Sequence, residues 1–486
     1  MIHSIQSELA GKGDEYEAVD YLHSDLVRYA SAYHFRSADV SELVLEDDYF
    51  RRPLRPEDLS FLKFSGYLKI KDASNLAALA GNRLLLSFYE SGACLYPPFS
   101  GKALLSPSAS QGVWSEFYNP ELRAIGARVA PRLETFLFSA VGEEAVRATP
   151  ADLPNSVSDF VGAHFRASSR FWTRLIDTLT AADYLADGMR LLLIQRVPLG
   201  RSRNLAMSRV AALHPFIPVP APSVAEEAWC AALGVRVGMH SYWQFYLPAV
   251  LAATTHIHML ARQPGTLLRL VGAALVEGAE QAGFMMAMAE GARRLGLPER
   301  APSADTADGA TRSVSSAVDA AVDEVTGTFG RTSLAEVARG AAAATLLTAQ
   351  AHRDVRAQLL WLSDMPRYVA AARAINRRID QDCPDIDRET FVEPREMCST
   401  THVHDDHRLV VIEEGQMVFW GNLGMSLRLD VGDMVLVPQG RLHGSTVESP
   451  VCTYHQPIIP PDWLDMLPGH VISPYASSPS LAVAWD

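Results

Sequence analysis

Apolar residues recur along the middle of the chain with the spacing of amphipathic helices. In five long runs they return every three or four positions, which places them on one face of a helix. Consecutive long helices joined by short links predict an all-α bundle. The five runs cover residues 171–197, 243–262, 267–295, 313–325 and 334–362.

The first part of the chain also has helical spacing, over residues 74–89 and 120–136. Prolines and a Ser/Gly-rich segment at 100–112 separate these runs, since proline cannot continue a helix and glycine disfavours one. Residues 1–135 are therefore predicted to form a helical domain with one long loop.

The pattern changes to a period of two in the last hundred residues. Apolar and polar residues alternate over 409–420 and 425–431, around turn residues at 421–424, as in strands of a small antiparallel barrel. A Pro- and acid-rich stretch at 382–396 precedes them. The predicted fold is multidomain, α + β: an N-terminal helical domain (1–135), a central helical bundle (136–380) and a C-terminal β-barrel (381–486).

Composition excludes several classes of protein. The 486 residues are 48% hydrophobic and 20% charged, with a net charge of −13, and no Lys/Arg-rich run is interleaved with aromatics. Nucleic acid and anionic membranes are therefore not expected as partners. No stretch approaches eighteen uninterrupted apolar residues, the N-terminus lacks a signal-peptide pattern, and five scattered cysteines form no CxxC pair. These features predict a cytoplasmic protein.

Three histidines in the C-terminal segment form a candidate metal site. His402 and His404 are one residue apart, so on a strand they point to the same face, and Gly415 follows eleven residues later. The segment 432–443 then reads G-D-x4-P-x4-H and ends at His443. These spacings match the two motifs of a cupin barrel, except that Arg408 occupies the position where the first motif usually has a glutamate.

Three neutral imidazoles leave up to three positions of an octahedron for substrate and dioxygen. This arrangement suits Fe(II), although Zn, Mn, Ni and Cu also accept imidazole ligands. The alternative is a metal-free cupin whose histidines only form hydrogen bonds. Tyr454 either orients a substrate or packs in the barrel, and Arg408 either binds a substrate carboxylate or points to solvent. His407 is expected on a solvated loop, and the role of His455 is open.

Several segments resemble the N-nitrosourea-forming metalloenzymes of streptozotocin biosynthesis. The resemblance implies an N-terminal dimerisation domain, a heme-oxygenase-like diiron domain that N-hydroxylates a methylated arginine, and a mononuclear iron cupin. In that family the cupin uses O2 to rearrange the N-hydroxylated guanidine into an N-nitrosourea. By resemblance, the iron ligands are His402, His404 and His443, and Tyr454 lies near the iron. The matching segments include Phe50-Arg-Arg-Pro-Leu-Arg-Pro56, Tyr242-Trp-Gln-Phe-Tyr246, Gly421-Asn-Leu-Gly-Met-Ser-Leu427 and Arg441-Leu-His443-Gly444.

The central region departs from the diiron pattern. That family has an H-x3-D-x2-H run late in the central domain, but the corresponding segment here, 310–319, contains no histidine. Asp183 and Glu277 lie near expected carboxylate positions and are interpreted as surface helical acids. His256 and His258 face different directions on a helix, so they are interpreted as core or surface histidines. We therefore expect a central scaffold without a diiron site.

Two hypotheses about function follow. In the first, the chain is a homodimeric non-heme Fe(II) oxygenase whose cupin forms an N–N bond by oxidative rearrangement of an N-hydroxylated, amino-acid-derived substrate. In the second, the cupin is non-oxidative, and the chain is a metal-assisted hydrolase or isomerase or a ligand-binding scaffold.

Overall fold

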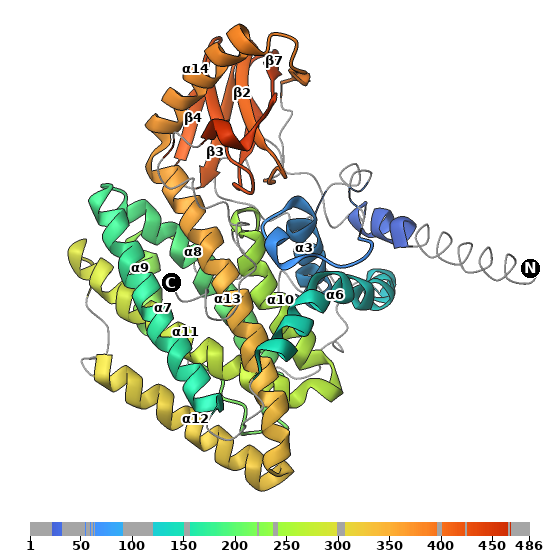
Figure 1. Ribbon diagram of the computed structural model, residues 1–486, viewed down its shortest axis with the longest axis vertical. Coiled ribbons are helices and arrows are strands. Elements are labelled where there is room, and N and C mark those ends of the chain that lie inside the picture. The colour runs from blue at the N-terminus through green and yellow to red at the C-terminus, as the bar shows by residue number, and fades with distance from the viewer. Residues whose placement is uncertain are drawn as a thin grey trace, which may run out of the picture.

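A computed structural model describes residues 22–31, 54, 59, 62, 64–90, 120–149, 156–220, 223–236, 242–298, 307–395, 401–422, 425–464 and 467. Within these residues, helices come first and a β domain built of antiparallel strands follows (Figure 1). The predicted class, a helical region followed by a β domain, is confirmed. No helix in the described part of the chain is both long enough and apolar enough to cross a membrane.

The helices form a bundle around α13, which runs lengthwise through the molecule toward the β domain (Figure 1). They are α3 (Leu76–Glu90), α6 (Pro120–Ala148), α7 (Ser156–Ala181), α8 (Leu185–Ala211), α9 (Val224–Ala232), α10 (Pro248–Arg262), α11 (Leu267–Arg294), α12 (Ala307–Phe329), α13 (Leu334–Ser363) and α14 (Met365–Asp382). Short 3-10 turns are η2 (Ile70–Asp72), η3 (Trp243–Phe245), η4 (Pro264–Thr266), η5 (Arg331–Ser333) and η6 (Pro461–Leu464).

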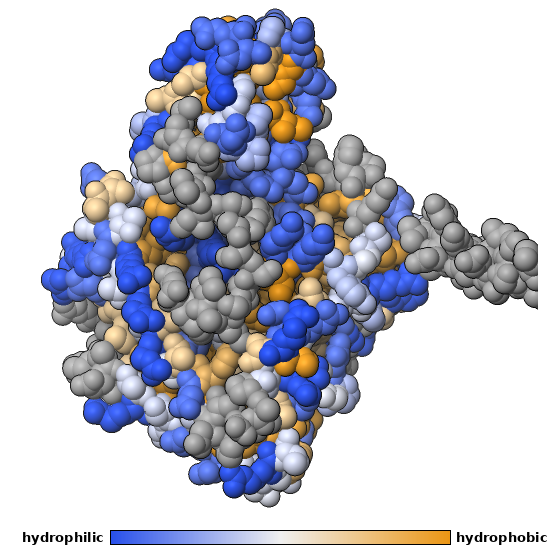
Figure 2. Space-filling view, in the orientation of Figure 1, coloured by the Kyte–Doolittle hydropathy of each residue, from blue (hydrophilic) through white to orange (hydrophobic). Residues whose placement is uncertain are grey.

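The run predicted at 171–197 is not one helix. It is divided between α7 and α8, because Asp183 adopts a left-handed conformation, with φ of 55°, that an α-helix cannot contain. The outward face of α7 is a hydrophilic ridge on the surface of the molecule (Figure 2). The exposed residues of this helix include Arg166, Arg170 and Arg174. Its inward face carries Trp172 and other buried residues. Helix α7 is therefore an outer helix of the bundle.

Helices α11 and α13 pack with their backbones in direct contact at two glycines. A Cβ atom on Gly272 would lie 1.9 Å from the carbonyl oxygen of Val337, and one on Gly340 would lie 2.0 Å from that of Arg269. Real Cβ atoms cannot approach a carbonyl oxygen so closely, so only glycine allows this helix pair to form. The contact fixes the centre of the bundle.

The β domain contains two antiparallel sheets. One has the strand order β1-β7-β2-β5, with β8 added beside β2, and the other has the order β4-β3-β6. The run predicted at 409–420 forms two strands, which turn at Gly415 with φ of 83°. The strands are β1 (Thr390–Pro394), β2 (His407–Glu414), β3 (Met417–Asn422), β4 (Met425–Leu429), β5 (Met434–Val437), β6 (Gly444–Val447), β7 (Val451–His455) and β8 (Ile458–Ile459).

The β domain shares its hydrophobic core with the helices. Helix α14 packs on β5, and Trp361 of α13 meets the ring of Phe419 edge-on at 6.1 Å. The Trp361 indole N–H also donates a hydrogen bond to the carbonyl oxygen of Leu436 at 3.2 Å. The bundle and the β domain are therefore joined by buried contacts. The domain boundaries at 135 and 380 remain predictions, and α6 and α14 each continue across one of them.

Candidate metal centre

Two of the three candidate ligands are paired through their backbones. The N–H of His402 donates to the carbonyl oxygen of His443 at 2.9 Å, and the N–H of His443 donates back to His402 at 3.1 Å. The two residues form an isolated antiparallel bridge, so their side chains leave the backbone on the same side. This pairing brings together one histidine from each sequence motif, 41 residues apart in the chain.

His404 completes a compact cluster of imidazoles, which we call the histidine triad. Ring centroids are 4.8 Å apart for His402 and His404, 4.5 Å for His402 and His443, and 5.0 Å for His404 and His443. One nitrogen from each ring lies within 4.8 Å of the other two. The structure therefore brings together the three histidines that the sequence motifs indicated.

Two rings of the triad, those of His404 and His443, have the protonation state and the available nitrogen that a metal ion requires. Nδ1 of His443 lies 2.8 Å from the carbonyl oxygen of Arg441, which assigns it the proton and leaves Nε2 with a lone pair. Nε2 of His443 and of His404 is buried without a hydrogen-bond partner in the described structure. Burial, followed by the charges of neighbouring groups, holds the pKa of both imidazoles well below the usual value. Neutral, unpartnered ring nitrogens fit a metal ion better than they fit a hydrogen-bonded cluster.

Arg408 lies near this cluster but is engaged elsewhere. Its guanidinium pairs with Glu389 and donates to the carbonyl oxygen of Gln456 at 3.2 Å. Its positive charge is one of the smaller causes that lower the pKa of His404. A substrate carboxylate would have to compete with Glu389 for Arg408.

The aromatic ring that packs on the triad is Phe419, which the sequence motifs did not indicate. Phe419 of β3 stacks on the ring of His443 with a centroid separation of 5.3 Å and an interplanar angle of 23°. Tyr454 of β7 is 5% exposed and stacks instead on Phe391 of β1. Phe419 thus forms an apolar wall beside one of the candidate ligands.

Among the described residues of the β domain, two further histidines, His407 and His455, have polar partners of their own. His407 was expected on a solvated loop, but it is half-buried at the start of β2, and its Nδ1 accepts the N–H of Gln439 at 3.0 Å. His455 lies 2.9 Å from the hydroxyl of Thr390 and 3.0 Å from the carboxylate of Glu413.

The helical bundle holds the segment that carries His402 through its neighbour Thr401. Arg83 of α3 donates to the carbonyl oxygen of Thr401 at 2.7 Å and to its hydroxyl at 2.8 Å. The side-chain oxygen of Gln244, in η3, accepts the N–H of Thr401 at 3.2 Å. All three residues are buried, so these bonds form in a medium where their loss is costly.

The bundle also holds the segment that carries His443. The side-chain amide of Gln358, on α13, donates to the carbonyl oxygen of Leu442 at 2.8 Å and accepts its N–H at 2.9 Å, as a neighbouring strand would. The guanidinium of Arg441 lies 3.7 Å from the carboxylate of Asp354, also on α13. Two helices and one turn of the bundle therefore anchor the backbone next to two members of the triad.

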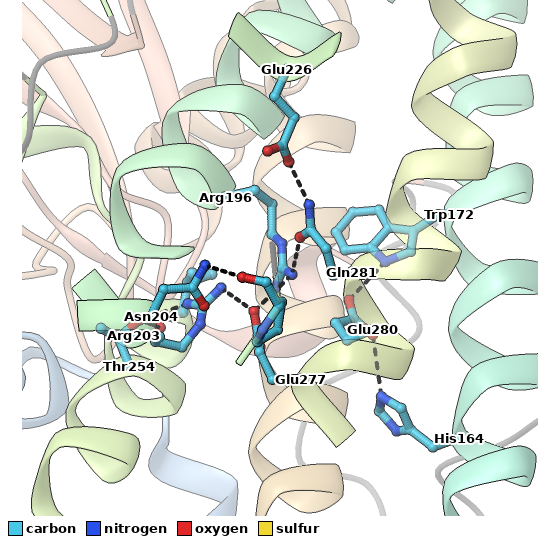
Figure 3. A network of polar contacts seen from close by, with 12 residues as sticks. His164, Trp172, Arg196, Arg203, Asn204, Glu226, Thr254, Glu277, Glu280 and Gln281 are labelled. Atoms are coloured by element: carbon cyan, nitrogen blue, oxygen red, sulfur yellow. Dashed lines mark hydrogen bonds and ion pairs between the residues drawn. The ribbon is translucent and has the colours of Figure 1, made fainter. Parts of the chain in front are cut away.

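The central bundle uses its carboxylates for ion pairs. Glu277 was interpreted as a surface acid, but it is only 8% exposed, because apolar helices pack around the charge-paired group. Its Oε1 accepts hydrogen bonds from Arg196 at 3.1 Å and from Arg203 at 2.8 Å (Figure 3). Asp183 is exposed, as expected, but it lies in the turn between α7 and α8 and not on a helix. Two guanidinium groups occupy the space beside Glu277, so the described residues do not fit a dinuclear metal site there.

A second buried carboxylate, which the sequence analysis missed, lies on the same helix. Glu280 of α11 accepts the indole N–H of Trp172 at 2.7 Å, and its other carboxylate oxygen lies 3.3 Å from His164 (Figure 3). The oxygen that accepts Trp172 also lies 2.8 Å from His352. Burial raises the pKa of Glu280, but its interactions with His352, His164 and Arg196 outweigh burial and hold the pKa well below the usual value. The three neighbours of Glu280 come from two helices far apart in sequence, α7 and α13. In the sequence, the only sign of this group was an acidic residue on the apolar face of a predicted helix.

Comparison with known proteins confirms the resemblance expected from the sequence. The chain is 25% identical over 462 residues to the nitrosourea synthase of Streptomyces achromogenes subsp. streptozoticus, a match that covers 89% of this chain and 94% of that protein. No protein-family model matches the chain. A match of this length extends over most of the helical region and into the β domain.

Proposed function

We propose that the chain is a non-heme Fe(II), O2-dependent enzyme of natural-product biosynthesis that forms an N–N bond. Its substrate would be a small N-hydroxylated molecule derived from an amino acid. The observation that carries this proposal is the compact triad of imidazoles, in a chain that resembles a nitrosourea synthase along most of its length.

In this proposal His402, His404 and His443 hold the iron. Three nitrogen ligands on one side leave coordination positions open on the other, as in non-heme oxygenases. Bound Fe(II) would supply the one-electron chemistry that dioxygen requires and a positive charge that attracts an N-hydroxy group. The ion pairs around Glu277 support a central bundle that acts as a scaffold rather than as a second iron site.

The chain's own residues would orient the ligands and limit access of water. The carbonyl oxygen of Arg441 accepts the Nδ1 proton of His443 and so directs Nε2 toward the other rings. The Phe419 ring covers one face of the His443 imidazole and excludes water there. The roles of Tyr454 and Arg408 in binding substrate remain predictions, as do the homodimer and the cytoplasmic location.

The proposal is tested by metal analysis of protein purified without oxygen. We expect near one iron per chain in the wild type and in His455→Ala, which removes a histidine whose partners lie outside the triad. We expect loss of iron in His402→Ala and His443→Ala. Reconstitution with Co(II), followed by its visible absorption spectrum, would report nitrogen coordination independently of any reaction.

Oxygen uptake with an N-hydroxylated arginine as probe tests the reaction. The wild type and His455→Ala should consume O2 and release a product with a new N–N bond, whereas both triad variants should not. Turnover of the probe without O2 uptake would support a non-oxidative enzyme instead. Undiminished O2 uptake in the triad variants would contradict the proposed centre, and about two irons per chain that survive removal of the triad would contradict the scaffold role of the bundle.

A further inference from the structure

A cavity of about 400 Å³ lies in the helical region, separate from the histidine triad. Its volume falls within the roughly 300–1,000 Å³ typical of small-molecule sites. It is formed where α6, α10 and α13 meet the turn η4 and the start of α11. Apolar and charged side chains both line it, including Phe138, His256, Met259, Arg269 and Arg339.

His256 presents unused hydrogen-bonding capacity to this cavity. Its side chain lies on α10, is 5% exposed and packs against the ring of Phe138 at 5.3 Å. Neither ring nitrogen has a hydrogen-bond partner among the residues that the structure describes. Burial, with a smaller contribution from the charge of Arg269, lowers the pKa of His256 to about 4. A neutral imidazole therefore offers one N–H donor and one acceptor to whatever occupies the cavity.

The cavity also has an excess of positive charge. Arg269 and Arg339 both pair with the carboxylate of Glu336, the former at 2.6 Å. Two cations thus share one anion, and each guanidinium keeps further N–H groups that Glu336 does not use. These groups are suited to a carboxylate, which binds guanidinium through charge-assisted hydrogen bonds.

The acidic residue in the cavity wall is not available to a cationic ligand. One oxygen of Glu134 accepts the Tyr89 hydroxyl at 2.6 Å and the Arg262 guanidinium at 2.6 Å. Its other oxygen accepts Arg262 at 2.8 Å and the Gln263 amide at 3.0 Å. Arg262 neutralises this carboxylate, so the cavity favours an anion over an amine or a zwitterion.

We propose that this cavity is a binding site for a small organic carboxylate with an apolar body. The carboxylate would pair with Arg269 and Arg339 and accept the N–H of His256, while the body packs against Phe138 and Met259. The site is built only from helices, and its occupation does not depend on the reaction proposed for the triad.

Three probes with one apolar body and different charges test this proposal. Isothermal titration of the full chain should show saturable binding of phenylacetate, one per chain. The neutral phenylacetamide and the cationic phenylethylamine should bind at least about tenfold more weakly, because they lack charge-assisted bonds to arginine. Equal binding of the three probes, or no saturable binding of phenylacetate, would overturn the proposal.

Variants locate the bound probe. Arg339→Gln and His256→Phe should each weaken phenylacetate binding by about tenfold or more, whereas Arg331→Gln, which changes an exposed arginine in η5, should leave it unchanged. His443→Ala should still bind phenylacetate, which separates this site from the triad. In 13C-labelled histidine spectra, phenylacetate should raise the pKa of His256, since a nearby anion favours the protonated ring. The assignment of the probe to this cavity would be refuted if Arg339→Gln and His256→Phe both bound phenylacetate with wild-type affinity. It would also be refuted if saturating phenylacetate left the pKa of His256 unchanged.

Discussion

Replacement of Gln358 tests whether the helical bundle positions the metal ligands. The Gln358→Leu variant keeps the approximate volume of the side chain but removes both hydrogen bonds to the backbone of Leu442, the residue before His443. Gln358 is fully buried and Leu442 is 1% exposed, so water cannot replace either bond. An unpaired buried donor or acceptor costs about 1–3 kcal/mol, so the two together should reduce the free energy of unfolding by about 2–6 kcal/mol.

The same variant should also weaken metal binding. The segment that carries His443 loses the amide that fixes it to α13, so Nε2 of His443 is held less firmly toward the other two rings. Loss of a residue that orients a metal ligand typically weakens metal affinity by about 10–100-fold. A tenfold loss would reduce the stabilisation that saturating metal confers by about 1.4 kcal/mol.

Gln350→Leu is the matched control. Gln350 lies on the same helix, is 4% exposed and donates one hydrogen bond, at 3.1 Å, to the carbonyl oxygen of Ile70 in the helical region. This variant should lose about 1–3 kcal/mol of stability but keep wild-type metal affinity. Urea unfolding measures the first quantity, and competition with a chelator, in conditions where both variants are folded, measures the second. The reasoning is refuted if Gln358→Leu binds metal as tightly as Gln350→Leu does.

Three further predictions concern the bundle. Gly272→Ala should lower the free energy of unfolding by about 3 kcal/mol or more in urea titrations, because its Cβ would meet a backbone carbonyl, whereas Gly278→Ala, which faces open space, should be neutral or stabilising. Equal losses of stability in Gly272→Ala and Gly278→Ala would contradict the backbone contact between α11 and α13. Glu277→Gln should lower the free energy of unfolding by about 3–5 kcal/mol, because it leaves the buried charges of Arg196 and Arg203 without their carboxylate. A decrease below about 1 kcal/mol would show that water reaches the two guanidinium groups. The depressed pKa of His256 means that the unfolded chain binds its proton first as pH falls, so stability should decrease by about 3 kcal/mol between pH 6.5 and 4. His256→Phe should remove that part of the pH dependence, and an unchanged profile would rule out a neutral buried His256.

Local sequence patterns predicted the structure correctly where a segment determines its own conformation. The helical spacing predicted α11 and α13 to within a residue or two, because burial of one face selects the period of 3.6 residues. The motif glycine Gly415 lies at a left-handed turn between β2 and β3, where a Cβ would meet the carbonyl oxygen of Val451 at 2.2 Å. The break between α7 and α8 was missed, since one left-handed residue ends a helix without altering the apolar period.

The sequence by itself determined that His402 and His404 share a face, that His443 ends a second motif, and that helices precede a β domain. Only the tertiary structure decided how His443 meets His402 and which parts of the bundle hold them, since these contacts join residues 41 to 318 positions apart. It also decided that Glu277 is buried between two guanidinium groups. Such contacts depend on how helices and strands pack together, and the period of one segment carries no information about its partners in space.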